Sequence, residues 1–183
     1  MRSSAFRDAS RWLRDESERC NALHAELASI PSPPFGEELR AQWLLDHFSD
    51  LSFPHCEIDQ QGNVVARRPG SARKSAGQIL LTAHLDTVFP AGTRFEVKRA
   101  GTRLCAPGIS DNTAGVIALL ITARLLAQFS FTHRLDIILA GTVGEEGEGN
   151  LRGMRHLFRT AEWRSRTRGV LVIDGAGTDA IVS

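Results

Sequence analysis

The chain has 183 residues, of which 42% are hydrophobic and 23% are charged, and its formal net charge is +1. This length supports one domain with a substantial core, and the composition argues against both a disordered chain and a membrane-embedded one. Because 22 Lys and Arg residues balance 21 Asp and Glu residues, the overall charge gives no reason to expect binding to nucleic acid or to an anionic membrane.

The cysteines and the N-terminal sequence both indicate a cytoplasmic protein. Cys20, Cys56 and Cys105 are odd in number and show no CxxC spacing, so neither a disulfide framework nor a zinc ribbon is predicted. The N-terminal sequence MRSSAFRDASRWLRDE is charged throughout and lacks the apolar segment of a signal peptide. No run reaches the roughly eighteen apolar residues of a membrane span. We therefore expect a soluble, cytoplasmic chain.

The first fifty residues are expected to form two helices separated by a proline-rich loop. From Ser4 to Ser29, apolar residues recur near helical spacing among charged neighbours, which predicts an amphipathic surface helix. The segment IPSPPFG (30–36) ends this helix, because three prolines in seven residues cannot continue it. A second helix is expected from about Glu37. Its apolar face consists of Leu39, Trp43, Leu44 and Phe48.

Several segments after the second helix are typical of strands. A strand or hairpin is expected between Cys56 and Arg67, and two short strands are expected on either side of the turn at Gly101. Three continuous apolar runs have the character of strands that are covered on both faces. They are residues 79–83, 135–140 and 169–173.

Two further helices alternate with these strands. Residues 113–129 are apolar almost all round, so this helix is expected inside the protein, and another helix is expected over residues 151–163. Alternation of buried strands with helices predicts an α/β fold. We expect a three-layer sandwich with a largely parallel central sheet.

The segment Ile79–Pro90, ILLTAHLDTVFP, is an apolar run that leads into His84 and Asp86. In an extended strand, residues two apart project from the same face, so the Asp86 carboxylate can reach the His84 ring. A neutral imidazole can bind a metal through one nitrogen while a carboxylate holds the other N–H. Taken alone, such a histidine near a strand end is more often a structural residue than a metal ligand.

More acidic residues follow the ends of the other predicted strands. Glu145 and Glu146 follow the strand at 135–140, Asp174 follows the strand at 169–173, and Asp111 lies on the loop that enters the buried helix. Ligands of open α/β sheets bind at the carboxyl ends of the strands. Carboxylates crowded there would repel unless cations neutralise them, and oxygen with imidazole suits zinc or a similar divalent ion. Two such ions need a bridging carboxylate, for which we choose Asp111.

Glu145 and Glu146 are neighbours in a glycine-rich loop, so their side chains can diverge towards different atoms. One can ligate a metal while the other takes a proton from metal-bound water, whose pKa the metal brings near neutrality. The alternative for this pair alone is a solvated acidic loop.

Four motifs carry a resemblance to a known group of enzymes. TAHLDTV, GISDNTAG, GTVGEEGEG and VIDG, in this order, resemble the metal-site motifs of the co-catalytic zinc peptidases of clan MH. This group includes aminoacylase, peptidase T, carboxypeptidase G, acetylornithine deacetylase and succinyl-diaminopimelate desuccinylase. The resemblance implies a zinc-peptidase-like catalytic domain with two Zn²⁺ ions, although Co²⁺ or Mn²⁺ can share such ligands.

The resemblance also implies a role for each candidate residue. The implied metal ligands are His84, Asp111, Glu146 and Asp174, and the implied catalytic side chains are Glu145 and Asp86. Asp111 would bridge the two ions, His84 and Asp174 would hold one of them, and Glu146 would hold the other. Glu145 would be the general base, and Asp86 would support His84. A cis peptide is implied after Asp111.

Relatives of this kind complete the second metal with a histidine near their C-terminus, after an inserted lid that also dimerises the enzyme. No such lid or histidine occurs between Asp174 and Ser183, and the remaining histidines lie away from the site. We therefore expect residues 1–183 to be the N-terminal part of the catalytic domain, incomplete at the C-terminus. The lid and the C-terminal part of that domain would be absent, leaving one competent metal site and one weak one.

The implied activity is hydrolysis of peptide or N-acyl amide bonds by metal-activated water, of the aminopeptidase, tripeptidase or deacylase type. The expected substrate is a small peptide or an N-acyl amino acid, and the full-length parent would be a homodimer. This chain alone is expected to be inactive or weakly active. The alternative is a non-catalytic metal-binding or interaction module that keeps the peptidase fold.

Overall fold

A five-stranded mixed sheet forms the centre of the protein, whose computed structural model describes residues 4–51, 53–72, 76–129 and 131–175. The strand order is β1-β2-β6-β3-β7. The strands are β1 (His55–Ile58), β2 (Val64–Arg68), β3 (Gln78–His84), β6 (Asp136–Thr142) and β7 (Thr167–Val172). β3 pairs in parallel with β6 and β7, whereas β2 is antiparallel to β1 and β6. Parallel pairing is confined to β3, β6 and β7, because β2 runs antiparallel to β6 as well as to β1.

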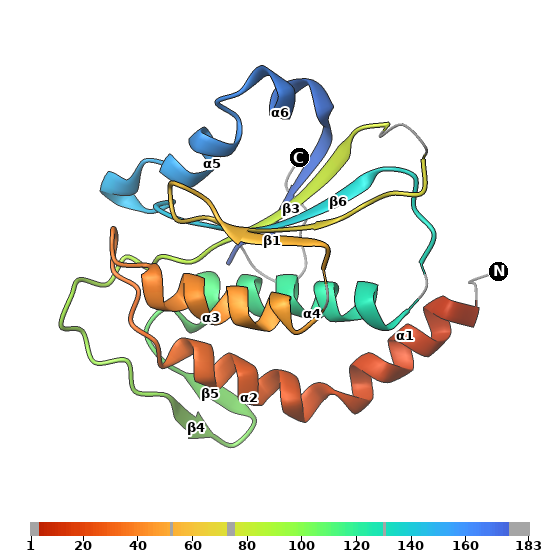
Figure 1. Ribbon diagram of the computed structural model, residues 1–183. Coiled ribbons are helices and arrows are strands. Elements are labelled where there is room, and N and C mark those ends of the chain that lie inside the picture. Colours follow the sequence, from red (N-terminus) through yellow and green to blue (C-terminus); the bar gives the residue numbers. More distant parts are fainter. Residues whose placement is uncertain (1–3, 52, 73–75, 130, 176–183) are drawn as a thin grey trace.

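Helices cover both faces of this sheet, as Figure 1 shows. One face carries the two short helices α5 (Arg152–Leu157) and α6 (Ala161–Arg166). The other carries α3 (Glu38–Ser49) and α4 (Gly115–Gln128), with α1 (Ser4–Asp15) and α2 (Ser17–Ala28) outside them. A separate hairpin comprises β4 (Lys98–Ala100) and β5 (Arg103–Cys105). The predicted α/β sandwich is confirmed.

The core lies between the sheet and the helix α4. Val116, Leu119 and Leu120 of α4 are buried against Leu44 of α3 and Leu139 of β6. The segment Ile109–Gln128, which has a kink at Asp111 and Asn112, is long and apolar enough to cross a membrane by length and composition alone, but half of it is buried inside the fold. Its apolar character is explained by contacts with β3, β6, α2 and α3.

Two predicted helices are each divided in the structure. The helix expected over residues 4–29 is interrupted at Glu16, whose φ and ψ of −85° and 2° separate α1 from α2. The helix expected over residues 151–163 is interrupted because the Thr160 side chain accepts a hydrogen bond from the backbone N–H of Trp163. Such a cap starts a new helix. Both single-helix predictions were therefore wrong about continuity.

Two predictions of burial were also wrong. The segment 169–173 was expected to be covered on both faces, but Val170, Leu171 and Val172 are 43%, 52% and 58% exposed. In the described part of the chain β7 pairs only with β3, so it forms an edge of the sheet. Leu39 was expected on the apolar face of its helix, but it is 65% exposed. Arg40 and Ala41 in the same helical turn are buried, so the side of α3 that carries Leu39 faces away from the core.

Candidate metal centre

His84 is the last residue of β3, and its ring is buried with two different environments for its nitrogens. Nδ1 lies 3.0 Å from the backbone carbonyl oxygen of Asp86. Nε2 lies 3.0 Å from Oδ1 of Asp111 and 3.5 Å from Oδ1 of Asp174. One nitrogen is therefore held by the chain, while the other faces carboxylates from two separate loops.

The Asp86 carboxylate is fully buried and binds the backbone of another loop. Its Oδ1 accepts the backbone N–H of Glu145 at 3.0 Å, and its Oδ2 accepts that of Glu146 at 2.9 Å. As expected, this carboxylate also lies beside the His84 ring. The distance from Oδ1 to Nδ1 of His84 is 3.6 Å, longer than its two hydrogen bonds to the loop. Asp86 thus connects the ring of His84 to the loop that carries both glutamates.

Asp111 lies in an irregular turn, η1 (Ile109–Ala114), where Asp111 and Asn112 depart from helical geometry. The peptide bond between them is cis, as the motif resemblance implied. The Asn112 side chain is buried; its Oδ1 accepts the N–H of Gly115, and its Nδ2 donates to the carbonyl of Ile173 at 2.8 Å. This side chain joins η1 to the end of β7 and so brings Asp111 beside Asp174.

The six predicted site residues meet at the carboxyl end of β3. His84, Glu145 and Glu146 each present a ligand atom within 4.8 Å of the others, and His84, Asp111 and Asp174 form a second group by the same measure. Asp86 lies directly behind both groups. One imidazole with four carboxylates is a donor set that suits a divalent ion such as zinc. The residues present therefore fit a metal.

The acidic groups also perturb one another. Burial raises the pKa of Glu145, with the negative charges of Asp174, Asp86 and Asp111 adding to the rise while His84 opposes it. Burial, together with Asp111 and Glu145, raises the pKa of Glu146. A cation placed among these carboxylates would relieve their repulsion.

His84 and Asp86 shift in opposite directions. Burial by itself would lower the pKa of His84, but the interaction with Asp86 and the charges of Asp174 and Glu145 raise it to about 9. Burial would likewise raise the pKa of Asp86, but His84 and the two amides of Glu145 and Glu146 lower it. Without a metal, these two residues form an ion pair behind the site.

Sequence reasoning missed several buried polar residues that support the site. Arg40 is fully buried, donates to the carbonyls of Ile30 and Leu85, and so ties the proline-rich loop to the residue after His84. Burial lowers the pKa of Arg40 to about 10, although the charge of Asp86 opposes this. Arg40 stands among other charged helical residues, so periodicity gave no signal that it is buried.

Asn63 and Glu37 are further supports that the sequence did not reveal. Asn63 accepts the N–H of Val143 at 3.1 Å and donates to the carbonyl of Gly153, so it binds both ends of the loop that carries Glu145. Glu37 is buried and accepts the N–H of Gly144. The one available signal for Glu37 is its place directly after the proline-rich loop.

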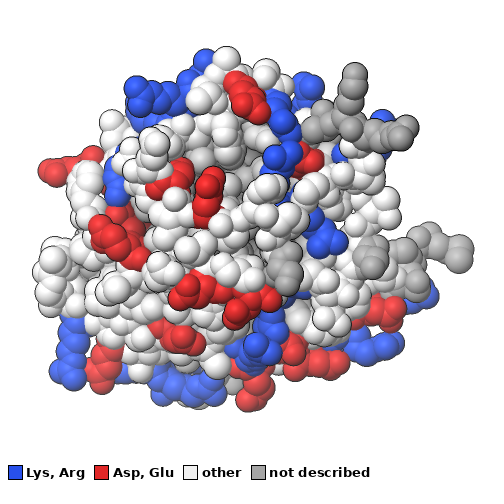
Figure 2. Space-filling model, in the orientation of Figure 1, with Lys and Arg blue, Asp and Glu red and all other residues white. Residues whose placement is uncertain are grey.

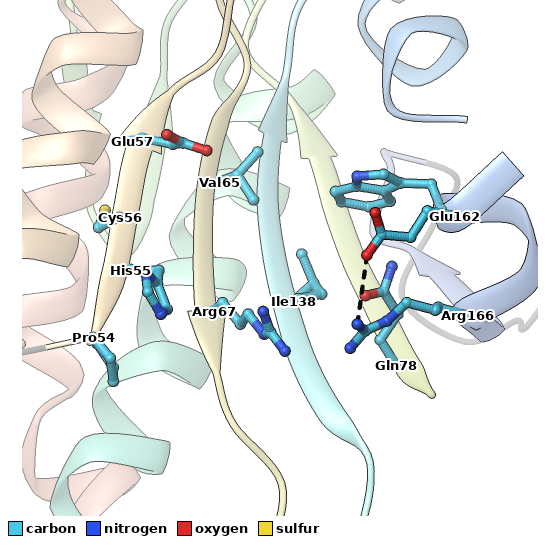
Figure 3. A pocket seen from close by; sticks show the side chains of 11 residues that line it. Pro54, His55, Cys56, Glu57, Val65, Arg67, Gln78, Ile138, Glu162 and Arg166 are labelled. Atoms are coloured by element: carbon cyan, nitrogen blue, oxygen red, sulfur yellow. Dashed lines mark ion pairs between the residues drawn. The ribbon is translucent and has the colours of Figure 1, made fainter. Parts of the chain in front are cut away.

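A separate cavity of about 430 Å³ lies at the other end of the sheet (Figure 3). It is bounded by Gln78, the first residue of β3, whereas His84 is the last. Arg67 and Arg166 face it, but both pair with Asp136, and Arg166 also contacts Glu162. The cavity therefore carries charges that compensate one another and is distinct from the metal centre. Acidic and basic side chains are also interspersed over the face of the molecule shown in Figure 2.

Comparison with known proteins identifies the group to which this site belongs. Residues 63–181, well over half of the chain, match peptidase family M28. The chain belongs to peptidase family M28. The resemblance drawn from the four motifs is confirmed, and the matched range contains all six candidate site residues. This M28 chain is also 36% identical over 67 residues to the cytosol non-specific dipeptidase of Escherichia coli K12, covering 36% of the chain and 14% of that protein.

Solved structures share the fold. The aminopeptidase PepT from Bacillus cereus ATCC 10987 matches with a TM-score of 0.70 at 24% identity. The match covers 87% of the M28 chain and 44% of the PepT chain. A tripeptidase from Staphylococcus aureus subsp. aureus Mu50 has a TM-score of 0.68 at 24% identity, with 88% and 44% covered. The M28 chain thus spans less than half the length of these peptidases.

Proposed function

We propose that this chain forms part of a metal-dependent hydrolase that cleaves peptide or N-acyl amide bonds in small substrates. The observation that carries the proposal is that His84 belongs to two groups of potential ligands, one with Glu145 and Glu146 and one with Asp111 and Asp174. Membership of peptidase family M28 supports the same reaction class.

We assign His84, Asp111 and Asp174 to one divalent ion, and Asp111 and Glu146 to a second, with Asp111 as the bridge. The proposed native metal is Zn²⁺, although Co²⁺ or Mn²⁺ suits the same donors. When bound, such an ion supplies Lewis-acid polarisation of the substrate carbonyl and lowers the pKa of water. Asp86 holds Nδ1 of His84 on the far side, which leaves Nε2 free to face the ion.

Glu145 is the proposed general base. Burial raises its pKa, and a carboxyl group with a raised pKa exchanges protons more readily near neutral pH. It would accept a proton from the attacking water and deliver it to the nitrogen of the leaving amine. Asp86 orients Glu145 for this transfer by accepting its backbone N–H at 3.0 Å.

We further propose that residues 1–183 are the N-terminal part of the catalytic domain of a cytoplasmic enzyme whose full-length form is a homodimer. The chain spans 44% of PepT and of the tripeptidase, which supports the part of this proposal that concerns an incomplete domain. In the part of the chain that the structure describes, the second ion would have only Asp111 and Glu146. We therefore expect this chain alone to be weakly active or inactive.

The same shortage of ligands favours a second candidate, a metal-binding module without turnover. Glu145 argues against it, because a binding module has no chemical need for a proton acceptor beside the ligands. The two candidates differ in the behaviour of Glu145→Gln in the longest available form of the protein. If the protein is an enzyme, Glu145→Gln should keep its metal and lose hydrolysis. If it is a binding module, neither the wild type nor Glu145→Gln should hydrolyse the substrates.

The proposal is tested by the zinc content of the purified chain after reconstitution and dialysis. We expect at least one tightly held ion in the wild type, loss of that ion in Asp111→Ala, and retention in Asp50→Ala, an exposed residue at the end of α3. Hydrolysis of a panel of dipeptides, tripeptides and N-acetyl amino acids is measured on the same samples. A folded wild-type chain that holds no zinc would contradict the proposed metal centre.

A further inference from the structure

The loop between β6 and α5 carries Glu145 and Glu146, and its backbone is bound by two carboxylates from elsewhere in the chain. The N–H of Gly144 donates to Oε1 of Glu37 at 3.1 Å. The next two N–H groups, of Glu145 and Glu146, donate to the carboxylate of Asp86. Three consecutive amides are therefore all directed at buried carboxylates, which leaves this stretch of backbone little freedom.

We propose that Glu37 is a positioning residue that holds the loop of residues 143–153 so that the side chains of Glu145 and Glu146 face His84. The inference rests on the proposed metal centre, because it assigns a purpose to the geometry of that loop. The hydrogen bonds of the Glu37 side chain go to Phe35, Gly144 and Arg152 and not to the candidate ligands. Glu37 therefore acts on the site through Gly144 and Arg152.

The other end of the same loop is also bound to Glu37. Arg152, the first residue of α5, donates from its guanidinium to Oε2 of Glu37 at 2.7 Å. Its backbone N–H donates to the carbonyl of Gly144 at 3.1 Å. One carboxylate thus contacts both the start and the end of the loop. Moving Glu37 would release both ends together.

Close packing inside the loop shows why this support has to come from outside. Gly144 has a φ of +60°, and a Cβ on it would lie 2.7 Å from Cγ of Arg152. A Cβ on Gly149 would lie 2.5 Å from Cα of Gly144. These positions are restricted to glycine, so no side chain at either can hold the backbone in place. Instead, Glu37, Asp86 and Asn63 hold the loop by accepting hydrogen bonds from its backbone N–H groups.

Burial and charge distinguish Glu37 from its neighbour. Glu37 is 3% exposed, whereas Glu38 is exposed at the start of α3. A buried carboxylate is costly unless it is paired and hydrogen-bonded, and Glu37 is both, with Phe35, Gly144 and Arg152 as its donors. The Arg152 guanidinium also lies 5.0 Å from the centre of the Phe35 ring. The ion pair between Glu37 and Arg152 therefore joins the proline-rich loop to the loop of residues 143–153.

The first test compares Glu37→Gln with the matched control Glu38→Gln, which makes the same charge change at the adjacent exposed position. Backbone hydrogen exchange is measured residue by residue on the metal-free chain. We expect the amides of Gly144 and Arg152 to exchange at least about tenfold faster in Glu37→Gln and to be unchanged in Glu38→Gln. Equal exchange in the two variants would overturn the proposal.

The second test measures zinc affinity in the same variants. Residues that support a metal ligand indirectly typically change affinity by about ten- to a hundredfold, and we expect a loss of that size in Glu37→Gln alone. Faster exchange with unchanged zinc affinity would overturn the connection between Glu37 and the metal centre. A wild-type chain that binds no zinc would contradict the proposed function, and the exchange measurement would still decide whether Glu37 holds the loop.

A double variant, Glu37→Gln with Arg152→Gln, serves as a control for the unpaired buried charge that Glu37→Gln leaves on Arg152. In it, two neutral amides replace the ion pair. If Glu37 acts through Arg152, the change in the free energy of exchange in the double variant will differ from the sum of the changes in Glu37→Gln and Arg152→Gln measured separately.

The wild type provides a test without any substitution. The Gly144 amide should be as protected as those of Glu145 and Glu146, and rapid exchange of Gly144 alone would overturn the proposal.

Discussion

Nε2 of His84 lies 3.0 Å from a carboxylate oxygen of Asp111, although 27 positions separate them in the chain. His84 ends β3, whereas Asp111 lies in η1, the irregular turn that leads into α4. The same ring nitrogen faces Asp174, and the ring is shared with the group formed by Glu145 and Glu146. His84 is therefore a member of both groups of potential ligands.

His84→Ala should weaken zinc binding by more than about a hundredfold, because it removes the one nitrogen ligand that both groups share. The matched control is His55→Ala, an exposed histidine of β1. Competition with a chromophoric chelator measures both affinities. Equal affinities in the two variants would mean that the carboxylates alone hold the ion.

The metal-free chain should become less stable as the pH rises above neutrality. The pKa of His84 is raised from 6.5 to about 9 in the folded protein. Its contribution to the free energy of unfolding is therefore complete below pH 6.5 and is lost between pH 6.5 and about 9. The Tm of the metal-free chain, measured with a chelator present, should fall over this range. In His84→Gln the decrease should be smaller, and a decrease of the same size would assign it to other groups.

Asp86→Asn should lower the pKa of His84 and weaken zinc binding by about ten- to a hundredfold. The substitution removes the negative charge beside the ring and leaves an amide where two backbone N–H groups require an acceptor. Titration of the histidine ring resonances by NMR measures the pKa directly. Asp50→Asn, at an exposed position, is the control and should leave the titration unchanged.

Leu119→Ala should destabilise the fold by about 2–5 kcal/mol, because Leu119 is fully buried in α4 and the substitution leaves a cavity. For a chain of this size each kcal/mol lowers the Tm by about 2–4 °C. Leu39→Ala is the matched control, since Leu39 is 65% exposed and should change stability by less than about 0.5 kcal/mol. Thermal unfolding of both variants decides whether α4 is the centre of the core.

Local patterns predicted the parts of the fold whose conformation depends on neighbours in the chain. The apolar run before His84 became β3, and the proline-rich segment separated α2 from α3. Burial of residues 169–173 was not predicted correctly, because an apolar run has the same sequence at the centre of a sheet and at its edge. Which of the two it becomes depends on the strands beside it.

The convergence of the candidate site residues could be predicted from local sequence patterns. His84, Glu145 and Asp174 each follow an apolar strand, and parallel strands in one sheet bring their carboxyl ends to the same edge. The contacts that hold these residues in place become visible only in the folded chain. Glu37, Arg40 and Asn112 are buried polar residues whose partners lie far away in the chain, and a hydrogen bond between distant residues leaves no periodic signal in the sequence.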